Sequence, residues 1–371
     1  MTTNELIKEE ILKANNPATD EVFGACGERV VVESNETTIN ITLIVGYPMR
    51  SLESEVSQFL IQEIHKISDG RGVEVAIKLQ VVAHAAQSGL KLLPNIRNVI
   101  AIASGKGGVG KSTTTTNLAL ALASEGANVG VLDADIYGPS QQVMLGLKGK
   151  PESADGKTIS PMKSHGVQAM SIGALVDVDQ PMVWRGPMVS QALEQLLRDT
   201  MWSDLDYLLI DLPPGTGDIQ LTLSQKVPLT GVVIVTTPQD IALIDAKKAL
   251  KMFEKVHVPI LGVIENMSVH ICSNCGHAEH IFGQGGGGTG SALLEAGWTE
   301  VVADTIYETQ VAGTGSADFG GANIEVHVIG AGGWSGRDGM GYGNCGGGGG
   351  GGGARATING AGVISYQVGT G

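Results

Sequence analysis

The chain is poor in aromatic side chains, in cysteine and in basic charge. Only 4% of its 371 residues are aromatic, four are cysteines, and 24 Lys and Arg stand against 38 Asp and Glu, a formal net charge of −14. This balance argues against a nucleic-acid partner, because binding to a phosphate backbone needs clustered positive charge. Four cysteines in such a pattern do not form a disulfide framework, so we expect a reducing compartment, the cytoplasm.

Long apolar segments are also missing. No stretch has about 18 uninterrupted apolar residues, the length that predicts a transmembrane helix. Residues 1–16 are charged and lack the apolar segment of a signal peptide. We therefore expect no membrane partner.

Residues 1–85 predict a small α+β domain, and residues 86–97 a linker. Amphipathic helical stripes and alternating strands follow one another in this part of the chain, and a helix packed on a small sheet is the natural outcome. Ser51 is the expected N-cap of the second helix. The expected helices are 5–14 and 51–68, and the expected strands are 37–45 and 73–82.

Residues 98–284 predict an α/β domain. Continuous apolar runs separated by helical patterns are typical of a parallel sheet with helices on both faces. Ligands bind at the carboxyl ends of the strands of such sheets. The expected strands are 99–104, 128–135, 207–213, 231–237 and 259–266.

Residues 285–371 form a tail of different composition. About thirty of the 54 glycines lie beyond Phe282, and eight are consecutive, from Gly346 to Gly353. A glycine run has no side chains to bury and a large ordering entropy. Two strand-like pieces, "NIEVHVIGA" and "GVISYQV", flank it.

The segment "GKGGVGKS" has the P-loop signature in its expected context, after a strand and before a helix. Its glycines let backbone N–H groups surround the phosphates of ATP, and the helix N-terminus adds partial positive charge. Lys111 is expected to reach the β- and γ-phosphates, and Ser112 to bind Mg²⁺. The full expected nucleotide-binding set of this loop is Gly105, Gly107, Gly108, Val109, Gly110, Lys111, Ser112 and Thr113.

Two carboxylate segments follow later strands. Asp133 and Asp135 lie in "VLDADIYGPS", and Asp211 follows four apolar residues in "YLLIDLPPGTGD", the pattern of a Walker B strand. We expect Asp211 to hold the Mg²⁺ shell through water and Asp135 to orient the attacking water. An aspartate that follows a strand is otherwise most often a helix cap.

Cys272 and Cys275 form a CxxC, with His277 and His280 close behind. Two thiolates at this spacing can bind one soft metal or one edge of an iron–sulfur cluster. A [4Fe–4S] cluster needs four ligands, and a symmetric dimer would supply the other two. A zinc site formed with the two histidines and a redox dithiol are the alternatives.

The segment "KGGVGKS" resembles the deviant Walker A motif of the MinD, ParA and nitrogenase-iron-protein class of ATPases. The resemblance implies that Lys106 reaches across a homodimer interface to the nucleotide of the partner subunit. A cation donated in this way can neutralise charge that develops on the transferring phosphoryl group.

Six segments together resemble the Mrp (ApbC) family of iron–sulfur cluster carrier ATPases: "SGKGGVGKST", "LDADIYGPS", "MVWRGPM", "LDYLLIDLPPGTGDIQLTL", "VTTPQDIALIDAKKA" and "GVIENMSVHICSNCGH". The resemblance covers roughly residues 95–284. It implies a homodimer that hydrolyses ATP, holds a [4Fe–4S] cluster on paired Cys272 and Cys275, and exchanges it with scaffold and apo-proteins. It also places Asn266 near the nucleotide base.

The resemblance ends where the tail begins, since the family continues there with further helices and a strand. The tail is similar to glycine-rich phage tail-fibre segments. Two other functions therefore remain: a spatial regulator of the MinD or ParA kind, and a fusion product with a structural tail and a vestigial ATPase part. The first would require ATP-dependent binding to vesicles or DNA, and the second a folded tail with negligible ATP binding.

Overall fold

The computed structural model describes residues 3–18, 22–24, 28–84, 90, 93–153, 155–174, 186–268, 270–272, 275 and 277–279, together with five short strand segments further on. Cys26, His280, Cys345 and the glycine run lie outside the described residues. Among the helices described, none combines the length and the apolar character needed to cross a bilayer.

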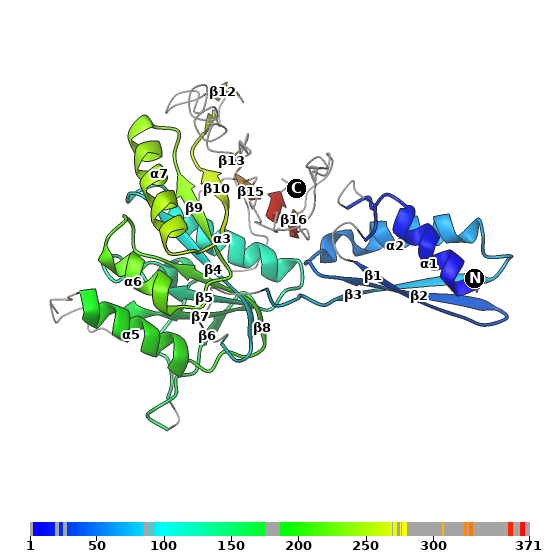
Figure 1. The fold of residues 1–371 in the computed structure, drawn as a ribbon, viewed down its shortest axis with the longest axis horizontal. Helices are drawn as coiled ribbons and strands as arrows, with labels where there is room; N and C mark the ends of the chain where they lie inside the picture. Colours follow the sequence, from blue (N-terminus) through cyan, green and yellow to red (C-terminus); the bar gives the residue numbers. More distant parts are fainter. Residues whose placement is uncertain are drawn as a thin grey trace.

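The N-terminal unit is a three-stranded sheet covered on one face by two helices (Figure 1). The strands are ordered β1-β2-β3; β1 runs antiparallel to β2, and β3 runs parallel to it. Buried side chains from α1, α2 and the inner faces of the strands form its core. Its elements are α1 (Thr3–Lys13), β1 (Arg29–Ser34), β2 (Thr38–Val45), a 3₁₀ turn η1 (Arg50–Leu52), α2 (Glu53–His65) and β3 (Gly72–Leu79).

Two details of this unit differ from the expectation. Strand β1 was not predicted, because as an edge strand it buries only Val30 and lacks a clear alternation. The prediction of Ser51 as N-cap was wrong: Ser51 lies inside η1, and α2 begins after Leu52, whose side chain makes no capping hydrogen bond. The Ser51 backbone N–H instead donates to Glu125 Oε2 at 2.9 Å, so the capping carboxylate comes from the neighbouring unit.

The second unit contains a seven-stranded sheet with the order β10-β9-β4-β8-β5-β7-β6. All neighbouring strands run parallel except β6, which pairs antiparallel with β7 at one edge. The α/β prediction is confirmed, and its five expected strands are β4, β5, β8, β9 and β10. The strands are β4 (Ile96–Ser104), β5 (Val129–Asp133), β6 (Met162–Ser164), β7 (Val167–Ser171), β8 (Leu205–Asp211), β9 (Gly231–Thr236) and β10 (Ile260–Glu265).

Helices cover both faces of this sheet, as predicted (Figure 1). On one face α5, α6 and α7 pack against the strands, and on the other α3 does. Val81, just after β3, is buried in the same cluster as the α3 side chains. The helices are α3 (Lys111–Ser124), a short α4 (Gln141–Met144), α5 (Gly186–Asp199), α6 (Asp218–Lys226) and α7 (Asp240–Lys255).

Helix α3 has four consecutive threonines after Lys111 and Ser112, and threonine is a poor helix former because its β-branched side chain loses rotamer freedom. Here the hydroxyls of Thr114, Thr115 and Thr116 each lie 3.0 Å from the carbonyl oxygen four residues earlier. This back-bonding satisfies the hydroxyls and allows all three side chains to be buried. The helix can therefore lie directly against the sheet.

The tail contributes only short strands to the described residues. The two strand-like pieces of the sequence are confirmed as β14–β15 and β17, whereas β16 was not predicted. Strand β17 pairs antiparallel with both β15 and β16. The bounds are β13 (Ile306–Tyr307), β14 (Asn323–Ile324), β15 (Val326–Val328), β16 (Arg355–Ile358) and β17 (Ile364–Gln367).

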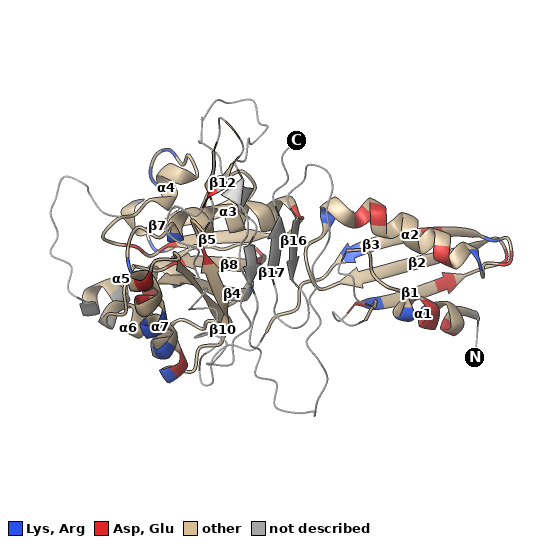
Figure 2. Cartoon of the chain, turned by 90° about the horizontal axis from the view of Figure 1, so that it is seen from above, with Lys and Arg blue, Asp and Glu red and all other residues tan. Residues whose placement is uncertain are grey.

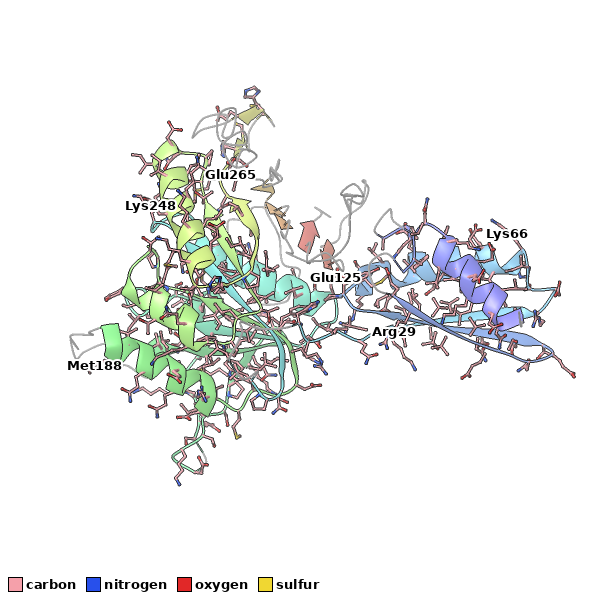
Figure 3. The ribbon with its side chains drawn as sticks, in the orientation of Figure 1. Arg29, Lys66, Glu125, Met188, Lys248 and Glu265 are labelled. Atoms are coloured by element: carbon pink, nitrogen blue, oxygen red, sulfur yellow. The ribbon has the colours of Figure 1, made fainter. Side chains whose placement is uncertain are left out.

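The two units meet at the far end of α3, where Glu125 lies between them (Figure 3). Besides the contact of its carboxylate with Ser51, its carbonyl oxygen accepts a hydrogen bond from the Arg50 N–H at 3.2 Å. Glu125 is buried, with 3% of its surface exposed. A single helix thus runs from the phosphate-binding loop to the N-terminal unit.

Replacing Glu125 by Ala should loosen this junction. The change removes the acceptor of the Ser51 N–H, and loss of a capping side chain costs about 1 kcal/mol of unfolding free energy. Hydrogen exchange at the Ser51 amide should accelerate, while exchange in β4 and β8 stays as in the wild type. The exposed Glu63→Ala is the matched control. Unchanged exchange at Ser51 in the Glu125 variant would contradict this role.

Candidate functional site

The P-loop connects β4 with α3 at the carboxyl edge of the sheet, where the sequence predicted it. Gly110, directly before the helix, has a left-handed φ of +83°. A Cβ at Gly110 would collide with the Asn266 side chain, and one at Gly105 would collide with the backbone of Asp245 in α7. The loop is therefore packed so closely between β10 and α7 that these positions require glycine.

Lys111 lies buried between two carboxylates. Its Nζ forms a short ion pair with Asp211 Oδ1 and lies 3.7 Å from Asp135 Oδ2. Only 6% of the lysine side chain is exposed, and the Asp211 side chain is fully buried. A buried charge is costly unless it is paired, so the lysine offsets the burial of the two carboxylates, and they offset its own.

Asp135 has an unused acceptor beside this lysine. Its Oδ1 is buried and has no hydrogen-bond partner among the described residues. Burial, the largest effect, raises the pKa of Asp135; Lys111 opposes the shift and Asp211 adds to it. A buried acceptor without a partner is unusual in a folded protein and indicates a place for a ligand or water.

Asp133 holds the loop that contains Asp135. Its carboxylate accepts backbone hydrogen bonds from Asp135 at 3.1 Å, Ser140 at 2.9 Å and Gln141 at 3.0 Å, and one from the Ser171 hydroxyl at 3.1 Å. Burial raises the pKa of Asp133 to about 6, and the charge of Asp211 on the neighbouring strand adds to the shift. The sequence predicted that Asp133 lies at the end of a strand, but not that its carboxylate anchors this loop.

Lys106, the first lysine of the loop, contacts helix α7. Its Nζ donates to Gln239 Oε1 at 2.9 Å, at the start of α7. The exposed apolar side chains Ile241 and Ile244 follow on the same helix. The structure thus separates Lys106 from Lys111, which the sequence places in one loop.

Asn266 lies at the end of β10 and contacts the P-loop backbone. Its Nδ2 donates to the Val109 carbonyl oxygen at 2.9 Å, and its Oδ1 accepts a hydrogen bond from the Met267 N–H at 3.0 Å. In this structure the side-chain amide supports the loop. Its expected position near the nucleotide base remains a prediction.

The CxxC follows β10 in a small antiparallel hairpin, β11 (His270–Ile271) and β12 (Ala278–Glu279). The Cys272 N–H donates to the His277 carbonyl oxygen at 2.9 Å, which closes the hairpin. Neither cysteine is in a disulfide; Cys272 is half-buried and Cys275 exposed. Within the described residues, no three His, Cys, Asp or Glu side chains converge on one metal position; His280, the fourth residue of the zinc alternative, lies outside them.

Sequence reasoning missed two glutamines that hold the site together. Gln141 Nε2 lies 2.9 Å from Asp211 Oδ2 and 2.9 Å from the Ser112 carbonyl oxygen. Gln220 Nε2 donates to the Pro213 carbonyl oxygen, which fixes the loop after Asp211. Glutamines are usually exposed, and nothing in "GPSQQV" distinguishes the buried Gln141 from its partly buried neighbour.

Comparison with known proteins finds relatives of this chain. A family model described as "ParA: NUBPL iron-transfer P-loop NTPase" matches residues 95–307. The iron-sulfur cluster carrier protein of Pseudomonas fragi is 60% identical over 232 residues, which are 62% of this chain and 80% of that protein. The carrier protein of Escherichia coli strain K12 is 54% identical over 252 residues, 68% of each chain.

Among solved structures, a nucleotide-binding protein from Archaeoglobus fulgidus in complex with ADP is 40% identical. It covers 56% of this chain and 81% of its own length, with a TM-score of 0.49. The fold and the site define a P-loop NTPase. The sequence matches establish that the chain belongs to the Mrp/NUBPL family of ATP-binding iron–sulfur cluster carriers.

The raised pKa of Asp133 should appear in the pH dependence of stability. Because the folded-state pKa of about 6 lies above the ordinary value of 3.8, the folded protein binds the proton more tightly than the unfolded chain. This contribution to the unfolding free energy is complete below pH 3.8 and is lost as the pH rises through 6. At full titration it amounts to about 3 kcal/mol.

Denaturant unfolding at pH 5.0 and 7.5 measures the part of this contribution that is lost between these two pH values. Asp133→Asn should show a weaker loss of stability between the two pH values than the wild type. Asp155→Asn, at an exposed carboxyl whose pKa is lowered by the Thr158 and Lys157 N–H groups, is the control and should keep the wild-type difference. An unaltered difference in the Asp133 variant would refute the assignment.

Proposed function

We propose that this chain hydrolyses ATP and carries a [4Fe–4S] cluster on a homodimer in the cytoplasm, taking it from scaffold proteins and delivering it to apo-proteins. The observation that supports this most directly is the linkage of the two sites. The strand β10 ends at a contact with the P-loop through Asn266, and the CxxC hairpin follows immediately.

The proposed nucleotide site consists of the P-loop, Lys111, Ser112, Asp135 and Asp211. The oxygen donors of Ser112 and Asp211 suit Mg²⁺, which prefers oxygen ligands, and the unused Oδ1 of Asp135 fits an incoming water. Bound Mg²⁺ would neutralise negative charge on the phosphates. In our proposal Lys111 leaves Asp211 to bind the phosphates, and Asp135 orients the attacking water.

The proposed homodimer rests on Lys106 and on the surface beside it. Lys106 is only half-buried and its Nζ bonds to Gln239 at the start of α7; in our proposal it exchanges this partner for the nucleotide of a second copy. Ile241 is 71% exposed and Ile244 55% exposed on the adjoining turn of α7. Exposed apolar side chains that gather near a functional cation favour a protein interface.

The proposed cargo site is the thiol pair of the hairpin. Cys272 and Cys275 provide two thiolates at a partly exposed position, and a second hairpin in a symmetric dimer supplies the remaining two. An accessible cluster shared between two chains can be passed on when the pair separates.

Figure 2 shows Lys and Arg interspersed with Asp and Glu on α7, without a continuous basic band there.

Lys106→Ala should lower kcat for ATP hydrolysis by at least about a hundredfold, because cations donated in trans to a transferring phosphoryl group contribute 10³–10⁵ in comparable enzymes. Lys248→Ala, an exposed lysine on α7 paired with Asp245, is the control. Mixing the Lys106→Ala and Lys111→Ala variants should restore roughly a quarter of the wild-type rate, because half of the dimers are mixed and each has one complete site. No recovery on mixing would contradict donation in trans.

Changing both Cys272 and Cys275 to Ala should abolish the absorbance of a cluster after anaerobic reconstitution, because the thiolates are its ligands. ATP affinity should stay within about twofold of the wild type, since neither thiol belongs to the phosphate site. Cys26→Ala and Cys345→Ala are the matched controls and should keep the cluster. Full iron and sulfide in the double variant would exclude the hairpin as the cargo site.

A further inference from the structure

Gln141 contacts three parts of the nucleotide site, although it belongs to none of the motifs that define that site. It is the first residue of α4 and is 1% exposed. Its Nε2 lies 2.9 Å from Asp211 Oδ2 and 2.9 Å from the Ser112 carbonyl oxygen. The Thr116 hydroxyl lies 2.7 Å from its Oε1, so both ends of the amide are engaged.

The two oxygens of Asp211 have different partners. Oδ1 contacts Lys111 and lies 3.4 Å from the Thr115 hydroxyl, whereas Oδ2 faces Gln141. If Lys111 moves to the phosphates, Oδ1 loses its ion pair while Oδ2 keeps its amide donor. Gln141 would then prevent the carboxylate from rotating.

The same amide also fixes the start of α3. Its contact with the Ser112 carbonyl oxygen holds the backbone of the residue whose hydroxyl is the expected Mg²⁺ ligand. The backbone N–H of Gln141 in turn donates to Asp133 Oδ2 at 3.0 Å, which anchors the glutamine itself. One side chain therefore sets the separation between Ser112 and Asp211.

We propose that Gln141 is a positioning residue that holds Ser112 and Asp211 in register for the magnesium form of the nucleotide. This inference rests on the proposed nucleotide chemistry of the site. Gln141 acts through Asp211 and Ser112 and touches neither nucleotide nor metal. It should therefore affect how strongly Mg²⁺ enhances nucleotide binding, and affect nucleotide binding without Mg²⁺ very little.

The test uses the full chain and a fluorescent ATP analogue. Affinity is measured in excess Mg²⁺ and in EDTA, and the ratio of the two dissociation constants gives the enhancement by Mg²⁺. Gln141→Leu fills the volume without hydrogen bonds. It should reduce the enhancement about tenfold, the effect of losing one charge-assisted hydrogen bond, while the affinity in EDTA stays within twofold. ATP turnover should show a raised Mg²⁺ concentration for half-maximal rate.

The adjacent Gln142 provides the matched control. It is only partly buried, and its Nε2 donates to the Gly149 carbonyl oxygen at 3.1 Å. Gln142→Ala should keep the wild-type enhancement. Gln141→Glu is a second variant of nearly the same shape. This variant places a carboxylate beside Asp211 and should reduce the Mg²⁺ enhancement at least as much as the leucine variant does. If Gln141→Leu fails to fold, Gln141→Glu tests the positioning role in its place.

The outcomes separate this inference from the proposed function. Wild-type enhancement and turnover in a folded Gln141→Leu variant would overturn the positioning role and leave the proposed function intact. Absence of any Mg²⁺ enhancement in the wild-type protein would overturn both. A merely structural role is also excluded by the design, because it would weaken binding equally in Mg²⁺ and in EDTA.

Discussion

The buried ion pair between Lys111 and Asp211 is the interaction on which the rest of the site depends. A lysine that is 6% exposed and a fully buried aspartate tolerate burial only together, with Asp135 as a second carboxylate nearby. The arrangement forces the ends of β5 and β8 and the start of α3 to converge on one position. In the proposed function, the anionic phosphates take Lys111 as their partner, and Asp211 then becomes free to face a metal ion.

Around this pair, elements distant in sequence are tied together by hydrogen bonds to the backbone. Asp133 binds the loop that contains Asp135, Gln141 bridges to α3, and Asn266 supports the P-loop from β10. At the other end of α3, Glu125 holds the N-terminal unit. A rearrangement of the P-loop on nucleotide binding would therefore act at both ends: on the strand that leads to the CxxC hairpin, and along the helix that leads to the N-terminal unit.

Much of this was predictable from the sequence, because the decisive signals are local. The glycine-rich loop, the apolar strands and the aspartates after them specify the α/β sheet and place Lys111, Asp135 and Asp211 at its carboxyl edge. The roles of Gln141 and Glu125 were not predictable, since their partners are distant along the chain. The prediction of Ser51 as an N-cap was wrong for the same reason: the Ser51 N–H donates to the carboxylate of Glu125, which belongs to the other unit. Edge strand β1 lacked the alternation that marks a half-buried strand.

The central claim is that two chains together hold one cargo, with nucleotide chemistry and thiolates shared between them. Iron and acid-labile sulfide per chain, determined after anaerobic reconstitution together with the mass in solution of the same sample, test this most directly. The account predicts a dimer with four irons and four sulfides per two chains, a [4Fe–4S] cluster bound through two CxxC pairs. A single chain that retains a full cluster, or a dimer that retains no iron, would contradict it.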